Sequence, residues 1–72
     1  MKRYPYIMSI QGSTVVVDTT LSGGIVIKNH GEVIVEQPMD EQLKEAYADK
    51  PDLWQEEIGR LELEAIRVAR HL

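Results

Sequence analysis

The sequence has no cysteine and only two histidines, His30 and His71. Without cysteine the chain has no disulfide bond, no thiolate ligand for zinc and no thiol nucleophile. Two histidines, one in a predicted turn and one near the C-terminus, are too few for a histidine-rich metal site. We therefore predict that the protein holds no metal ion and uses no other cofactor.

Long apolar segments are also absent. No run approaches the roughly 18 consecutive apolar residues that indicate a membrane-spanning helix. Lys2 and Arg3 give the chain a basic start like that of a signal peptide, but no apolar segment follows them. The sequence therefore predicts a cytoplasmic protein with no membrane segment.

Positive charge is scarce. Eight Lys and Arg residues are outnumbered by twelve Asp and Glu residues, which gives a formal net charge of −4 at pH 7. This balance disfavours non-specific binding to nucleic acid or anionic lipid and is compatible with a basic protein partner. Lys2 and Arg3 stand beside Tyr4 and Tyr6, so a nucleic-acid-binding regulator that uses this basic N-terminus is an alternative.

The chain is short. Its 72 residues are expected to form a single domain, 1–72, near the size below which one core gives little surplus stability. Small domains that lack disulfides often gain stability by oligomerising. We therefore expect a homodimer.

The first part of the chain, 1–37, has the pattern of a β half. Alternating or β-branched segments predict strands at 4–10, 14–19, 25–28 and 32–36. Asn29-His30-Gly31 suits a tight hairpin with Gly31 in the left-handed conformation. Residues 20–24, with two glycines, predict a flexible loop.

The second part, 38–72, has the pattern of a helical half. Pro38 is expected to end the sheet, because proline cannot donate a ladder hydrogen bond. A short helix is predicted at 39–48 with Asp40 as its N-cap or first-turn acid, and a long helix from about Pro51 to the C-terminus. The fold class is thus α+β: a small antiparallel β-meander of about four strands, followed by a short and a long C-terminal α-helix.

One apolar stripe dominates the long helix. Its residues recur at alternating spacings of four and three, which places them on one side of a helix: Trp54, Ile58, Leu61, Ala65, Val68 and Leu72. The simplest interpretation is the core-facing side of the helix. The stripe is wide, and Gly59 within it permits close approach by another element, so part of it is also expected to contact a partner.

Five residues form the predicted partner or dimer interface: Trp54, Ile58, Leu63, Ile66 and Leu21. Leu63 is an apolar residue among charges, and Leu21 is an apolar residue in a Ser-Gly loop. The strand segments 15–17 and 25–27 are apolar at every position. Both faces of these strands are therefore expected to be covered, one by helices and one by a second subunit.

No catalytic set emerges from the sequence. Asp18 and His30 could form an acid–base pair, but no nucleophile accompanies them. The carboxylates at 56–57 and 62–64 are interpreted as solvated residues on the water-facing side of the helix. The sequence therefore predicts a small acidic, non-enzymatic protein-interaction module: a homodimeric regulator or inhibitor of the bacterial or phage accessory type. A minimal ligand-binding or enzymatic dimer, with Asp18 and His30 at a composite site, is the remaining alternative.

Overall fold

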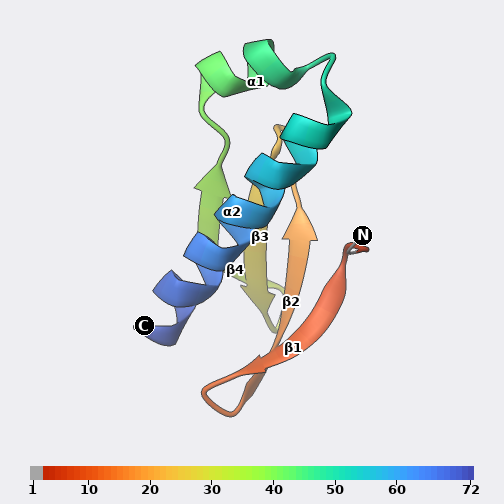
Figure 1. Ribbon diagram of the computed structural model, residues 1–72. Coiled ribbons are helices and arrows are strands. Elements are labelled where there is room, and N and C mark those ends of the chain that lie inside the picture. Colours follow the sequence, from red (N-terminus) through yellow and green to blue (C-terminus); the bar gives the residue numbers. More distant parts are fainter. Residues whose placement is uncertain (1–2) are drawn as a thin grey trace.

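The computed structural model describes residues 3–72 and contains a sheet followed by two helices (Figure 1). The sheet is antiparallel with strand order β1-β2-β3-β4, and each strand pairs with its neighbour in sequence. The elements of the chain, in sequence order, are β1 (Tyr6–Ile10), β2 (Ser13–Thr19), β3 (Gly24–Asn29), β4 (Glu32–Pro38), α1 (Glu41–Tyr47) and α2 (Pro51–Arg70). The predicted α+β class and the four-stranded meander are confirmed.

Local sequence signals explain where the elements begin and end. β4 ends at Pro38, as expected. α1 is shorter than predicted because Asp40 lies outside it as the N-cap, its carboxylate accepting a hydrogen bond from the Gln42 N–H at 2.8 Å. Met39 is buried, and its N–H donates to the Gly23 carbonyl. α2 begins at Pro51, which lies at the start of the helix where no backbone donor is needed.

Two tight turns connect the strand pairs at one end of the sheet. Gln11 and Gly12 have φ of 51° and 81°, and His30 and Gly31 have φ of 53° and 80°. Two consecutive residues with positive φ form the turn that matches the right-handed twist of a hairpin. The left-handed Gly31 predicted from the sequence is thereby confirmed.

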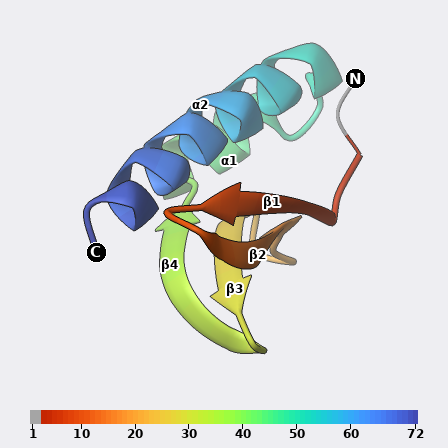
Figure 2. The same cartoon turned by 90° about the horizontal axis from the view of Figure 1, so that it is seen from below.

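α2 crosses one face of the sheet and buries it (Figure 2). Its buried apolar residues are Ile58, Leu61, Ala65 and Ala69, and they form one core with the inward-facing residues of the strands. Most of the predicted stripe therefore belongs to the core, whereas Leu72 at its end is 70% exposed. No helix within residues 3–72 is long and apolar enough to span a membrane.

The opposite face of the sheet has no helix over it (Figure 2). Paired positions in the strands share a face, so Ile7, Val16, Lys28 and Val33 form one row across it. Ile7 is 71% exposed and Val33 is 53% exposed, whereas Val26 in the inner strand β3 is buried. The apolar strand segments noted in the sequence thus meet the helix on one side only.

Alanine substitutions at two glycines are expected to change the free energy of unfolding in opposite directions. A Cβ on Gly59 would meet no atom of another element within 4 Å, contrary to the close approach expected from the sequence, so Gly59→Ala should raise the free energy of unfolding by about 0.5–1 kcal/mol. A Cβ on Gly24 would lie 2.5 Å from the Gln37 carbonyl oxygen. Gly24→Ala should therefore lower the free energy of unfolding.

Urea unfolding of both variants and the wild type measures these changes. A destabilised Gly59→Ala protein, or an unchanged Gly24→Ala protein, would contradict the packing around these two glycines.

A candidate partner-binding pocket at Trp54

The loop between β2 and β3 is held by its own hydrogen bonds. The Thr20 N–H donates to the Gly24 carbonyl at 3.0 Å, and the Gly23 N–H donates to the Thr20 carbonyl at 3.1 Å. The Thr20 hydroxyl oxygen accepts a further bond from the Gly24 N–H at 3.0 Å. These hydrogen bonds hold the backbone of the loop, which carries Leu21 at its tip with the side chain fully exposed.

Trp54 packs directly against this loop. It lies in the first turns of α2 and is half-buried against the core. A Cβ on Gly23 would stand 2.9 Å from Cζ2 and 3.0 Å from Cη2 of the indole ring. Gly23 also has φ of 85°, which favours glycine. The indole can thus lie this close to the loop because position 23 has no side chain.

A pocket of about 330 Å³ opens where the loop meets α2. Its wall residues come from the N-terminal segment, the loop and the helix: Tyr4, Thr19, Thr20, Leu21, Gly23, Trp54, Gln55 and Ile58. A second hollow of about 360 Å³ lies at the corner between the helices and is lined by Tyr47, Ala48, Pro51, Trp54 and Gln55. Trp54 and Gln55 line both, so the indole lies between two adjacent depressions.

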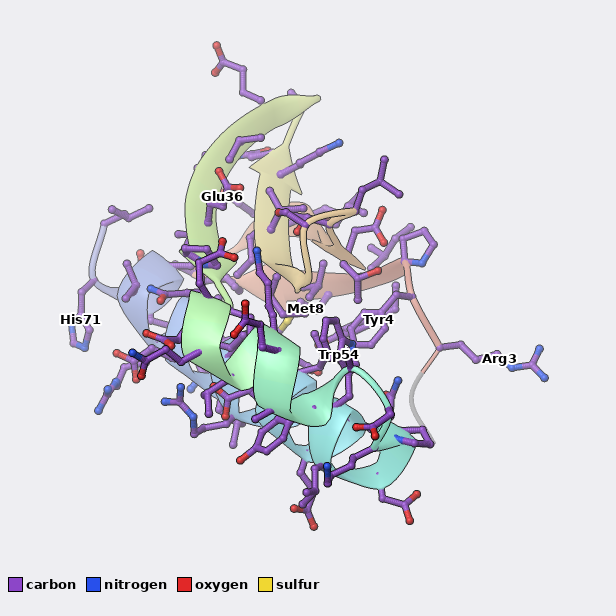
Figure 3. All side chains as sticks on the ribbon, turned by 90° about the horizontal axis from the view of Figure 1, so that it is seen from above. Arg3, Tyr4, Met8, Glu36, Trp54 and His71 are labelled. Atoms are coloured by element: carbon purple, nitrogen blue, oxygen red, sulfur yellow. The ribbon has the colours of Figure 1, made fainter. Side chains whose placement is uncertain are left out.

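A buried carboxylate lies behind this pocket. Glu62 of α2 is 1% exposed and accepts hydrogen bonds from the phenol groups of Tyr4 and Tyr6, one at each carboxylate oxygen. The centroids of the two tyrosine rings are 5.8 Å apart. Figure 3 shows Tyr4 next to Trp54, whereas Arg3 points away. The chain segment before β1 is therefore fastened to α2 through polar groups.

This environment raises the pKa values of Tyr4 and Tyr6. Burial, and then the hydrogen bond to Glu62, raise the pKa of Tyr4 above its ordinary value of 10.0, and the same two causes raise the pKa of Tyr6. Both phenols are thus protonated donors at neutral pH. Because they are committed to Glu62 and their rings are half-buried, they are poorly placed to stack on nucleic-acid bases.

The structure separates the five residues of the predicted interface. Trp54, Ile58 and Leu21 line the same pocket, although Ile58 is only 3% exposed and belongs mainly to the core. Leu63 is 68% exposed elsewhere on α2, and Ile66 is half-buried against the core. The structure thus brings Leu21, Trp54 and Ile58 together at one pocket and leaves Leu63 and Ile66 outside it.

Two carboxylates lie where the sequence analysis did not expect them. We interpreted Glu57 and Glu62 as water-facing, but both are buried. At about 100° per residue, Glu62 lies about 100° from Leu61, inside the apolar sector that includes Ala69 and Ile66. From this angle on the helix, the burial of Glu62 could have been predicted. Glu57 lies at the flank of the stripe, where the hydrogen bond from Arg60 holds its pKa below the ordinary value.

The residues considered for chemistry are not assembled within the chain. Asp18 lies opposite Val26 of β3. His30 comes four residues after Val26, so it lies about 13 Å from Asp18 along the strand direction. The Asp18 carboxylate instead accepts a hydrogen bond from the Thr19 N–H at 2.7 Å. Residues 3–72 contain no group of three or more His, Cys, Asp and Glu side chains that could hold a metal ion. Lys2, part of the basic N-terminus considered for nucleic acid, lies outside the described residues.

Comparisons with protein-family models, curated proteins and solved structures give no match for this chain.

The Tyr–Glu62 contacts predict loss of stability in alkali. A group whose pKa is raised by folding contributes its full stability below the unfolded-state pKa, and that contribution is lost as pH rises through the folded-state pKa. The free energy of unfolding should therefore decline as the pH rises above 10. Phenolate absorbance in a Tyr47→Phe background reports Tyr4 and Tyr6 alone, because the chain has three tyrosines.

Glu62→Gln is the matched variant for this titration. It removes the negative charge, so both phenols should ionise at lower pH than in the parent protein. Identical titration curves for the folded and the urea-unfolded parent would show that the two tyrosines do not bind a buried carboxylate.

Proposed function

We propose that this chain is a non-enzymatic protein-interaction module, active as a homodimer, that binds a second protein at the Trp54 pocket. The observation that carries the proposal is the position of Leu21. Its side chain is fully exposed, yet the loop that presents it is fixed by hydrogen bonds and lies against Trp54. An apolar side chain held in water by an ordered loop makes no contribution to the core of its own chain.

The surroundings of Leu21 have the composition of a binding surface. Protein interfaces concentrate their binding energy in a few aromatic and large apolar anchors, surrounded by polar groups that exclude water. Trp54 and Tyr4 provide aromatic surface here, and Thr19, Thr20 and Gln55 provide polar groups at the same pocket. Because Trp54 is already half-buried and packed, little side-chain entropy is lost when a partner covers it.

The net charge favours a basic partner. At −4 the chain attracts a positively charged surface over a longer range than a neutral chain would, which accelerates encounter and disfavours acidic partners. A module of this kind acts by covering the surface of its partner, so regulation or inhibition of that partner is the activity we propose.

Two exposed leucines provide a matched test of the binding site. Leu21→Glu places a charge at the pocket, whereas Leu63→Glu places the same charge on an exposed part of α2 outside it. Proteins from the native cell are captured on each immobilised variant, and the captured partner is then titrated in purified form. Leu21→Glu should weaken binding by about tenfold or more, with Leu63→Glu close to the wild type.

Equal affinity of all three proteins for the purified partner would place its binding site elsewhere. A blank surface without immobilised protein corrects for non-specific adsorption. Thermal unfolding of each variant separates lost binding from lost folding.

A further inference from the structure

The sheet has two edges, formed by β1 and β4, and they differ in their protection. A strand edge presents backbone N–H and C=O groups that can pair with another chain, and natural proteins block such edges with charges, proline and bulges. β4 has all three of these features. It contains Glu32 and Glu36, ends in Pro38, and is irregularly paired opposite Ile27 and Lys28.

β1 has none of these features. Its five residues, YIMSI, contain no charge and no proline, and its register with β2 is regular along the whole strand. Among the described residues, β1 has only β2 as a strand neighbour. The edge of β1 is therefore suited to pairing with a further strand, whereas the edge of β4 is not.

The side chains of β1 are also incompletely covered. α2 packs mainly over β3 and β4 and contacts β1 less (Figure 1). Met8, which points to the helix side, is only half-buried against the core, and Ile7 on the other face is 71% exposed. A strand added beside β1 would cover apolar surface on both faces of the sheet.

A second copy of β1 matches this edge. In an antiparallel pair centred on Met8, Ile7 lies opposite Ser9 of the second copy, and the two Met8 residues face each other. In this register, side chains of opposite residues point to the same face of the joined sheet. The helix-covered face of one copy therefore continues into that of the other. None of these pairs carries a charge, whereas two β4 strands would bring glutamates together, and two chains of net charge −4 repel each other in general.

We propose that two copies of the chain join through β1, antiparallel about a two-fold axis at Met8, to form one continuous eight-stranded sheet. This assignment rests on the homodimer in the proposed function and names its interface. Apart from Tyr4, the residues that line the Trp54 pocket belong to β2, the β2–β3 loop and α2, none of which forms the proposed interface.

Sedimentation equilibrium measures the assembly. The wild type at tens of micromolar should approach twice the chain mass of 8.2 kDa. Ile7→Lys should raise the dissociation constant by about tenfold or more, because the two lysines would lie diagonally across the joined strands. Val33→Lys is the matched control: it lies on the same face but in β4, and it should dimerise like the wild type.

A cross-link tests the register directly. The chain has no cysteine, so Met8→Cys introduces a single thiol, and residues directly opposite in antiparallel strands have Cα atoms close enough for a disulfide. Met8→Cys should form a covalent dimer under mild oxidation, and Val33→Cys should not. This result decides the matter if Ile7→Lys proves to be unfolded by circular dichroism.

The outcomes separate the two proposals. A wild type that is monomeric at every concentration overturns both the homodimer and the β1 interface. A dimer that persists in folded Ile7→Lys and is not cross-linked through Met8→Cys overturns the β1 interface alone. Neither result bears on binding at Trp54, which is tested with Leu21→Glu.

Discussion

The structure depends on one constraint: a single long helix must cover a four-stranded sheet. α2 meets this constraint by lying mainly over β3 and β4, where it buries Ile25 and Ile27 completely. Nothing remains to cover β1 fully, and the short α1 adds no buried residue of its own. Because one helix covers only part of the sheet, β1 stays partly exposed and the outer face of the sheet stays uncovered. The proposed pairing with a second copy would cover part of this surface.

The weak coverage of β1 also explains the value of the contacts at Glu62. A buried carboxylate destabilises a core unless hydrogen bonds replace its lost hydration. Two phenols supply such bonds, and they come from residues more than fifty positions away in the sequence. The beginning of the chain is thus joined to the last helix by directional polar contacts, at the side of the sheet where apolar contacts are sparse. Such contacts fix the position of α2 along the sheet in a way that uniform apolar packing cannot.

Much of the fold could be predicted because its signals are local. The turn residues His30 and Gly31, the Asp40 cap and Pro51 act on their own segments, and the spacing of the stripe defines the buried side of α2. The site was only partly predictable. Trp54 and Leu21 stand out as residue types in their segments, but the pocket between them depends on how the β2–β3 loop meets α2. Glu62 was missed because a charged residue was interpreted by its type, although its angle on the helix placed it among apolar neighbours.

The full exposure of Leu21 has a consequence for how this surface can change over evolutionary time. Positions that contribute to both folding and recognition can vary only within the limits that the core imposes. Leu21 contributes no buried surface to its own chain, and the backbone around it is held by Thr20, Gly23 and Gly24. Its side chain can therefore be replaced while the loop keeps its shape. Under the proposed function, substitution at this one position would alter which partner is bound without any compensating change in the core.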